Sequence, residues 1–367
     1  MDEQHFQFTK AHTQIAKGIA ITLMMIHHLF RFPDRIQKVS YISILPLGNL
    51  RLEYLLGDFG NICIAMYLFL SGYGLYMSTI KKECFSLKDS WRKILKFLIN
   101  YWVVFMLFVP IGLVWFSDST RYHFNIISFL ANLFTLSSSY NSEWWFVRLY
   151  IELLLLFPLI SGILKRGIKV ATVTSFGFYL VAIIMELIPV ILPRLAFLKT
   201  NFIYGDLRNI LFWQITFCMG CIIAKYKLFS HINKWIAVKR LDRSAFYIAI
   251  ILGIIVIRNG CSYVFEVIGK GNPTYVDFIL APIFILIATN FVYKSKGKKV
   301  FSTLGVHSTN MWLTHTFFCY YYFQTIVFMP KLSILILIWL GLLSLGSSII
   351  INFVMSASGR MLQKSVN

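Results

Sequence analysis

Titratable side chains occur inside apolar stretches of this sequence, where they are costly. The segment 17–32 opens with Lys17 and carries His27 and His28 near its end. Because Lys17 and His28 are eleven residues apart, a helix places them within about 20° of one face and about 16 Å apart along its axis. That distance excludes a direct hydrogen bond but suits the two ends of one elongated ligand, whereas His27 points about 100° away.

A histidine in this position could act as a general base, because its unperturbed pKa of about 6.5 suits proton transfer close to neutral pH. Ionisable residues in membrane spans cost about 2.5–3.5 kcal/mol each and often mark functional sites. A structural interpretation is equally open from spacing alone. In that case Lys17 is an anchor that reaches the membrane surface, and His28 is an interfacial residue.

Three more ionisable residues lie in apolar segments. Arg148 and Glu152 are four residues apart, so they share a helix face and we expect them to pair with each other. A neutralised pair that fixes helix packing is the favoured interpretation. His315, in "MWLTHTFF", is either a core histidine with its hydrogen bonds satisfied or a second site residue.

Glu143 precedes two tryptophans at the start of an apolar segment. Trp144 and Trp145 first indicate an aromatic belt at the membrane surface. They could also form a platform on which a sugar stacks.

The composition places the chain in the membrane class. Of its 367 residues, 58% are hydrophobic and only 14% are charged, and the mean hydropathy is +0.70. A soluble domain carries about 25% charged residues. We therefore expect an all-α, polytopic integral membrane protein, with a single transmembrane domain over residues 1–367 and no appended soluble domain.

Apolar runs of the length that a bilayer requires, roughly 20 residues, occur ten times. They cover residues 13–30, 59–80, 97–116, 145–164, 170–192, 207–224, 244–265, 275–293, 304–328 and 332–355. With the connections assigned to alternating sides, 23 of the 35 Lys and Arg residues fall on one side. Because an excess of Lys and Arg marks the cytoplasmic side, we expect both termini in the cytoplasm. The net charge of +20 is then mainly an orientation signal, and no nucleic-acid partner is expected.

The cysteines do not predict a metal site. Cys218 and Cys221 have CxxC spacing, but they lie in an apolar segment with no second pair. Small buried thiols that pack a helix interface are the preferred interpretation, and we expect no metal.

A set of short motifs, in this order along the chain, resembles the membrane-bound acyltransferase 3 family. The first helix of the family carries Arg or Lys, ten residues, then His, and "KGIAITLMMIHH" supplies Lys17 and His28. "WRKILKFLINYW" resembles the start of the family's third helix, with Lys93 and Lys96 where the family has Arg. The likeness covers essentially the whole chain. Its other motifs are "MYLFLSGYGL" at 66–75, "EWWFVRLYIELLLLFPLI" at 143–160, "FCMGCIIAKYKLF" at 217–229 and "LGVHSTNMWLTH" at 304–315.

The resemblance implies an O-acetyltransferase of a bacterial plasma membrane. Such an enzyme transfers an acyl group, usually acetyl, from cytosolic acetyl-coenzyme A to a hydroxyl of a cell-surface or lipid-linked polysaccharide. It makes His28 the preferred general base and Lys17 a second catalytic residue. The phosphates of the donor would bind electrostatically to a basic cluster, which consists of Lys88, Arg92, Lys93 and Lys96. We assign acceptor binding to Glu143, Trp144, Trp145, Arg148 and His315.

A transporter or flippase of a glycan or lipid-linked intermediate is the alternative, because helices with internal charge suit that function too. The sequence shows no repeated half and no matched pair of interrupted helices, which weighs against it. A protein that only mediates interactions would not need Lys17, His28 and His315 inside its spans.

Overall fold

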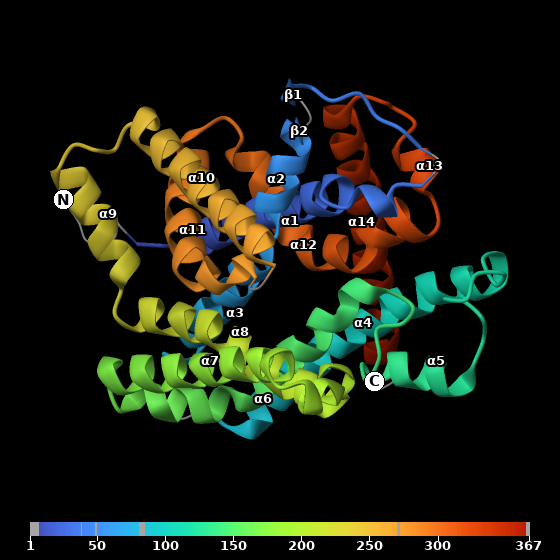
Figure 1. The fold of residues 1–367 in the computed structure, drawn as a ribbon, viewed down its shortest axis with the longest axis horizontal. Helices are drawn as coiled ribbons and strands as arrows, with labels where there is room; N and C mark the ends of the chain where they lie inside the picture. Colours follow the sequence, from blue (N-terminus) through green and yellow to red (C-terminus); the bar gives the residue numbers. More distant parts are fainter. Residues whose placement is uncertain (1–6, 38, 48–49, 81–84, 270–271, 365–367) are drawn as a thin grey trace. The chain divides into compact units, whose positions relative to one another are not determined.

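The fold is helical almost throughout (Figure 1). The structure is a computed structural model that describes residues 7–37, 39–47, 50–80, 85–269 and 272–364. Its longer helices are α1 (Lys10–Phe30), α2 (Leu52–Gly60), α3 (Cys63–Thr79), α4 (Leu87–Trp115), α6 (Trp145–Lys165), α7 (Ile168–Ile191), α8 (Phe202–Lys225), α9 (Leu228–Val238), α10 (Ser244–Ile268), α11 (Asp277–Lys294), α12 (Lys298–Thr316) and α14 (Ser333–Lys364).

Shorter elements connect these helices. They are the 3₁₀ helices η2 (Pro33–Arg35), η3 (Ser142–Trp144), η4 (Pro193–Thr200) and η5 (Pro273–Val276), the π-helical segment η6 (Phe317–Tyr321), and the helices α5 (Ile126–Leu133) and α13 (Gln324–Val327). The strands β1 (Pro46–Leu47) and β2 (Leu50–Arg51) form one small antiparallel pair.

The ten apolar runs expected from the sequence lie mainly on helices, although the run 59–80 is interrupted between α2 and α3 and the run 304–328 continues past α12 through η6 to α13. Within the described residues, eight helical segments are long and apolar enough to cross a membrane by length and composition. The two that fall short are α1, which includes Lys10 and Lys17, and α12, which is rich in Ser, Thr, Asn and His. The all-α, polytopic membrane class is therefore confirmed, and the helices that carry His28 and His315 are the least lipid-like of the ten.

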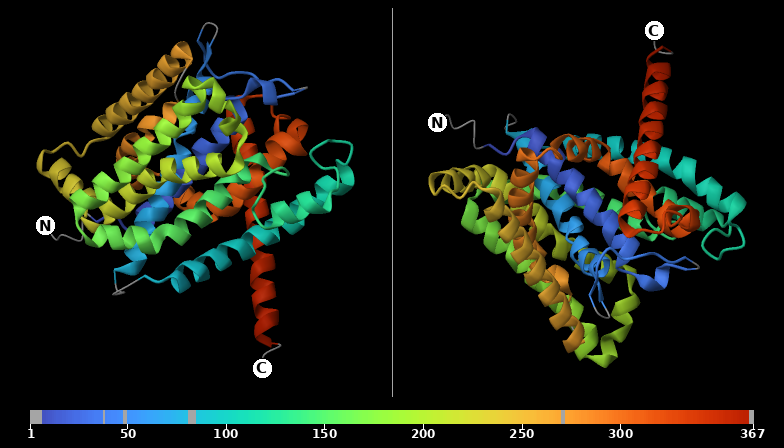
Figure 2. Two further views of the ribbon diagram at one scale, coloured as in Figure 1. Left: turned by 60° about the horizontal axis from the view of Figure 1, so that its bottom comes forward. Right: turned by 90° about the horizontal axis from the view of Figure 1, so that it is seen from above.

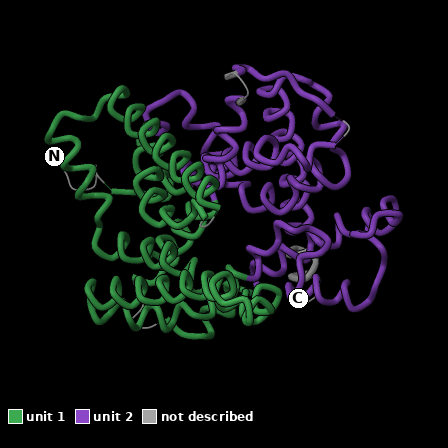
Figure 3. Tube along the Cα trace, in the orientation of Figure 1, with its two compact units in different colours: residues 1–13, 64–94, 149–291 green, residues 14–63, 95–148, 292–367 purple. Residues whose placement is uncertain are grey.

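The chain divides into two compact units, and each is built from three separate stretches of sequence (Figure 3). Unit 1 comprises residues 1–13, 64–94 and 149–291, and unit 2 comprises residues 14–63, 95–148 and 292–367. The expectation of a single domain stays a prediction.

In unit 2, α1 and α12 approach each other at glycines. A Cβ atom at Gly18 would collide with the carbonyl oxygen of Phe301, and one at Gly305 would collide with that of Gln14. Small residues allow such close backbone approach between membrane helices, where dispersion rather than the hydrophobic effect drives packing. The glycine of the "KGIA" motif therefore fixes the helix that carries Lys17 and His28 against the helix that carries His315.

The polar residues of α12 hold its neighbours in unit 2. Asn310 accepts a hydrogen bond from Asn100 of α4 at 2.7 Å and donates one to Asn352 of α14 at 3.0 Å. His307 contacts the hydroxyl of Ser348 of α14 at 2.9 Å. Interhelical hydrogen bonds of this kind stabilise membrane helix pairs by about 0.6–2 kcal/mol each, so the low hydropathy of α12 serves packing as well as the site.

In unit 1, α7 and α8 lie side by side (Figure 2). Ser175 of α7 donates a hydrogen bond to Gln214 of α8 at 2.7 Å. On the same α8, Cys221 is a free, buried thiol that contacts the carbonyl oxygen of Gly72 of α3 at 3.3 Å. Cys218 is likewise free and buried, in keeping with thiols that pack a helix interface. Cys84 lies outside the described residues.

Candidate active site

Three of the residues that sequence reasoning selected come together in unit 2. His28 lies near the end of α1, Glu143 in η3 and His315 at the end of α12. The Nε2 atom of His28 lies 3.8 Å from Oε2 of Glu143. Its ring centroid is 5.1 Å from that of His315. Glu143 retains only 15% of its side-chain exposure, His28 is 6% exposed and His315 is fully buried.

Arg35 holds the carboxylate oxygen of Glu143 that does not face His28. Its Nη1 donates a hydrogen bond to Oε1 of Glu143 at 3.0 Å, and its guanidinium packs over the rings of Phe32 and Tyr320. Burial lowers the pKa of Arg35, but the charges and hydrogen bonds of Glu143 and Tyr320 raise it by more, so the net shift is upward. Each oxygen of the Glu143 carboxylate therefore has its own cationic or potentially cationic neighbour.

The tautomer of His315 follows from its hydrogen bonds. Its Nδ1 lies 3.1 Å from the carbonyl oxygen of Met311 and 2.8 Å from that of Trp312. Carbonyl oxygens only accept hydrogen bonds, so Nδ1 carries the proton and the neutral ring presents a lone pair at Nε2. Within the described chain this buried Nε2 has no hydrogen-bond partner. Such an atom needs an explanation, and a proton donor on a substrate or on His28 would satisfy it.

Tyr320 links the same cluster to the backbone of α1. Its hydroxyl donates a hydrogen bond to the carbonyl oxygen of His28, and its oxygen lies 3.4 Å from Nδ1 of that ring. Tyr320 belongs to the π-helical segment η6 that follows α12. Single π-helical turns are rare and recur at functional sites, and this one shifts the register of the side chains directly after His315.

The neighbours of Glu143 fix its position against the end of α12. Asn141 caps η3 by accepting a hydrogen bond from the backbone N–H of Glu143 at 3.1 Å, and it exchanges hydrogen bonds with Thr316. Trp144 donates from its indole Nε1 to the carbonyl oxygen of Leu313 at 3.1 Å. The residues on both sides of Glu143 are thus tied to the residues on both sides of His315.

The two adjacent histidines differ in the way their spacing predicts. His27 contacts the carbonyl oxygen of Gly57 of α2 at 2.7 Å, so its Nδ1 is the donor. It thereby tethers two helices, whereas His28 faces Glu143 and His315. Lys17 is half-buried near the other end of α1, and its role as a second catalytic residue stays a prediction.

The tryptophans next to Glu143 have different surroundings. Trp144 is 2% exposed and packs edge-on against Tyr101 and Phe317, so it has no open face on which a sugar could stack. Trp145 is half-buried. Arg148 lies one turn further along α6, and its contribution to acceptor binding and its pairing with Glu152 stay predictions.

The predicted donor cluster lies at the start of α4. Its four basic side chains are all exposed, and three of them, Lys88, Arg92 and Lys96, recur every four residues and share one helix face. Lys93 lies on the adjacent face. The assignment of this cluster to coenzyme A stays a prediction.

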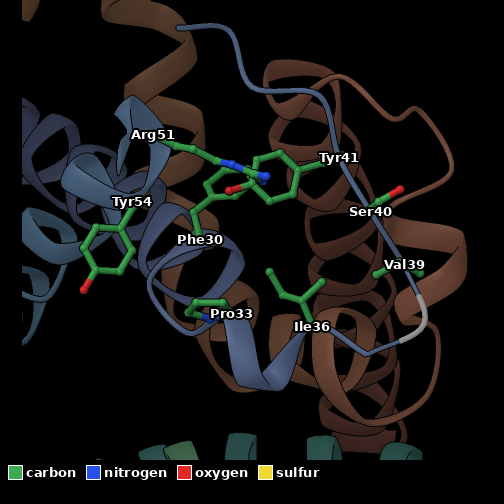
Figure 4. A pocket seen from close by; sticks show the side chains of 8 residues that line it. All are labelled: Phe30, Pro33, Ile36, Val39, Ser40, Tyr41, Arg51 and Tyr54. Atoms are coloured by element: carbon green, nitrogen blue, oxygen red, sulfur yellow. The ribbon is translucent and has the colours of Figure 1, made fainter. Parts of the chain in front are cut away.

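Two pockets lie beside the loop that follows α1. A pocket of about 290 Å³ is lined by Arg35, Gln37, Arg121, Ser142, Tyr320, Tyr321 and Gln324. We call it the arginine pocket. A second pocket of about 490 Å³ is mainly aromatic and aliphatic, with Arg51 at its edge (Figure 4), and it is lined by Phe30, Pro33, Ile36, Val39, Ser40, Tyr41, Arg51 and Tyr54. Of these two pockets, only the arginine pocket is lined by residues that contact the cluster of His28, Glu143 and His315. Arg35 contacts Glu143, and Tyr320 contacts His28.

Sequence reasoning did not select Arg35, Tyr320 or Arg121. In the predicted topology Arg35 and Arg121 fall on the side that is poor in Lys and Arg, where orientation does not require a basic residue, and this position is the sequence signal that could have indicated them. Tyr320 lies in the aromatic run "FFCYYY", which gives no sign of which ring turns toward His28.

Comparison with known proteins identifies the family. The model of the acyltransferase 3 family, described as an acyltransferase domain, matches residues 14–356, which include every residue of the cluster. No curated protein and no solved structure matched the chain. The family match extends through both units and over nearly the whole length of the sequence. The chain therefore belongs to the acyltransferase 3 family of membrane acyltransferases.

Proposed function

We propose that the protein transfers an acetyl group from acetyl-coenzyme A to a hydroxyl of a cell-surface or lipid-linked polysaccharide, with His28 as the general base. The observation that carries the proposal is the convergence of His28, Glu143 and His315. They come from three distant parts of the sequence and form one buried cluster next to a polar pocket. The family match supports acyl transfer over the transporter or flippase alternative.

The cluster supplies what the reaction needs. The acceptor oxygen attacks the thioester carbonyl, a C–O bond forms and the C–S bond breaks. The hydroxyl proton passes to His28 and then to the departing thiolate of coenzyme A. As the imidazole takes up the proton, its positive charge develops 3.8 Å from the Glu143 carboxylate. Opposite charges at about 4 Å attract by about 4 kcal/mol at an effective dielectric constant of about 20, so Glu143 favours the protonated state that the transfer creates.

Arg35 and His315 keep this arrangement in place. Arg35 donates a hydrogen bond to one oxygen of Glu143 and so fixes the position of its carboxylate. The lone pair at Nε2 of His315 is held beside His28, where it can accept a hydrogen bond from the acceptor hydroxyl or from protonated His28. Arg35 acts through Glu143 and is a positioning residue, whereas His315 would contact the acceptor directly.

The donor proposal rests on charge and on the chemistry of coenzyme A. Its phosphates carry several negative charges, and the exposed basic cluster at the start of α4 supplies the opposite charge. Lysine binds phosphate as a point charge rather than through a bidentate contact, so this binding depends on ionic strength. Both termini in the cytoplasm would place this cluster on the side where the donor is made.

The experiment that tests the function uses the purified full-length chain in lipid vesicles with acetyl-labelled acetyl-coenzyme A. Label that appears on an added glycan, with release of one thiol per acetyl group, is the expected result. Mass analysis of surface glycans from cells with and without the gene identifies the natural acceptor. If acetylation is unchanged in the cells and no acceptor-dependent thiol release occurs in vesicles, the proposal is wrong.

A further inference from the structure

The arginine pocket has an unusual charge arrangement for a site that takes a sugar. Two of its lining residues are arginines, and their states differ. Arg35 is paired with Glu143. Arg121 forms no ion pair with any described residue, although its charge acts on Glu143. The pocket therefore retains one positive charge that the protein does not neutralise.

Arg121 is held so that part of its guanidinium stays available. Its Nη1 donates to the carbonyl oxygen of Ser139 at 2.5 Å and to the hydroxyl of Ser142 at 3.2 Å, and its plane packs over Tyr321. In the described chain Nε and Nη2 have no hydrogen-bond acceptor. A guanidinium that is fixed on one side and open on the other is preorganised for a planar anion, because two parallel N–H groups match the two oxygens of a carboxylate or phosphate.

Hydrogen bonds fix the positions of the other residues that line the pocket. Gln324 donates to the carbonyl oxygen of Arg35 at 2.8 Å and accepts from the backbone N–H of Gln37 at 2.9 Å. Tyr321 accepts from the backbone N–H of Ser142 at 3.2 Å. The oxygens of such amide and hydroxyl side chains can accept hydrogen bonds from sugar hydroxyls, and the volume of about 290 Å³ lies just below the usual range of ligand pockets, about 300–1,000 Å³. The dimensions suit one sugar residue rather than a long chain.

We propose that the arginine pocket is the acceptor subsite and that it selects a sugar that bears a negative charge, with Arg121 as the residue that binds the charged group. The inference rests on the proposed function, because Arg35 and Tyr320 place the pocket next to the candidate base. A sugar carboxylate and a sugar phosphate share the required chemistry.

The test compares three disaccharide acceptors that differ only in one substituent. One carries the carboxylate of a uronic acid, one is its neutral carboxyl-reduced form, and one carries a phosphate on the reduced form. Transfer from acetyl-coenzyme A is measured with the full-length protein in vesicles, and binding of each acceptor is measured by calorimetry without donor. We expect the wild type to use at least one anionic acceptor with about 10- to 100-fold higher kcat/KM than the neutral form, the range for loss of a charge-assisted hydrogen bond. The better of the two anionic acceptors identifies the source of the charge.

Substitution of Arg121 decides the assignment. Arg121→Gln should abolish the preference mainly through KM, and Arg121→Lys should restore part of it because the charge remains while the bidentate geometry is lost. Arg51→Gln is the matched control, because Arg51 packs over Tyr41 in the same unit but borders the other pocket (Figure 4). It should leave the preference unchanged.

The outcomes separate the two proposals. Equal use of neutral and anionic acceptors by the wild type would overturn the inference and leave acyl transfer intact. An unchanged preference in Arg121→Gln, or an equal loss in Arg51→Gln, would overturn it as well. If no acceptor is acetylated, the proposed function fails, while calorimetric binding of an anionic sugar that depends on Arg121 would still support the pocket.

Discussion

Each unit contains an arginine–carboxylate pair, and the two pairs differ in burial and in geometry. In unit 1, Arg258 of α10 and Asp277 at the start of α11 are both fully buried and form a bidentate pair, Nε to Oδ1 at 2.9 Å and Nη2 to Oδ2 at 3.0 Å. In unit 2, Arg35 reaches Glu143 through a single contact at 3.0 Å and is 44% exposed. The other carboxylate oxygen faces His28 at 3.8 Å, which is too long for a hydrogen bond.

The geometry of the unit 1 pair suits a structural role, in which it holds two helices together. The geometry of the unit 2 pair suits a site where a proton is transferred. Arg258 and Asp277 face each other in a closed, bidentate geometry, with two hydrogen bonds between fully buried side chains. In unit 2 the second carboxylate oxygen of Glu143 faces His28, whose charge can change. The cluster also contains the Nε2 atom of His315, which has no hydrogen-bond partner among the described residues, and it borders a pocket. Incomplete satisfaction of buried polar groups is costly and is expected where chemistry requires it.

The largest expected effect is on catalysis in unit 2. If His28 is the general base, His28→Ala should lower the rate of acetyl transfer by about 10²- to 10⁴-fold, the usual contribution of a positioned base. Rates are measured at matched amounts of folded protein in vesicles.

His27→Ala is the matched control for this prediction. His27 is the adjacent imidazole on the same helix but bonds to Gly57, so its loss should affect stability more than the chemical step. Equal, small losses at both positions would identify His28 as an interfacial residue, and a fully active His28→Ala would end the mechanism.

The second effect is on stability in unit 1. Asp277→Ala leaves Arg258 buried without its carboxylate, which should destabilise the protein by about 3–5 kcal/mol. Thermal unfolding of the purified protein in detergent measures it, and the specific activity of the molecules that stay folded should be unchanged.

A double substitution sharpens that result. Arg258→Met combined with Asp277→Leu removes both charges and should recover most of the lost stability, because well-packed apolar side chains often replace a buried pair at no cost. If Asp277→Ala instead lowers specific activity without lowering stability, the unit 1 pair is not purely structural.

The third effect tests whether Glu143 acts through His28 in unit 2. Glu143→Gln keeps the shape but removes the charge that stabilises protonated His28. Because the full attraction is about 4 kcal/mol at most and Glu143 keeps some exposure, we expect a loss of kcat of about 10- to 10³-fold, smaller than that of His28→Ala. The double mutant with His28→Ala should be no slower than His28→Ala alone, and additive losses would show that the two residues act independently.

The sequence predicted much of this arrangement. The apolar runs predicted the positions of most of the long helices, and three of the clustered residues, His28, Glu143 and His315, were predicted from their types and positions. The remaining members depend on tertiary geometry. Arg35 and Tyr320 reach the cluster only because η2 and the π-helical segment η6 direct them there, and neither element has a strong sequence signal. The Arg258–Asp277 pair is not predicted from the sequence, because Asp277 begins a helix, Arg258 lies within the apolar run 244–265, and neither position indicates the other as its partner.

The predicted acceptor site and the predicted donor site also differ in how they would bind a charged ligand. The smallest expected effect tests that difference. Arg121 is held by fixed hydrogen bonds, whereas Arg92, Lys93 and Lys96 are exposed on α4. Replacing these three with Gln should raise the KM for acetyl-coenzyme A by about 3- to 30-fold, since each exposed charge contributes about 1 kcal/mol or less. The effect should shrink as salt is raised from about 0.01 M to 0.15 M, where the Debye length falls from about 30 Å to about 8 Å.

The control for the donor cluster is an equal change of charge elsewhere on the predicted cytoplasmic side. Lys239, Arg240 and Arg243 are exposed basic residues between α9 and α10, and their replacement with Gln should leave the KM for the donor unchanged. Equal effects of the two triple mutants would mean that only the overall field attracts the donor. An unchanged KM in the α4 triple mutant at low salt would mean that these side chains do not bind the donor and serve only to orient the chain in the membrane. Lys96→Arg should have no effect on the KM for the donor if the cluster acts only through its charge. A lower KM in Lys96→Arg would instead indicate a fixed contact between this side chain and a phosphate of the donor.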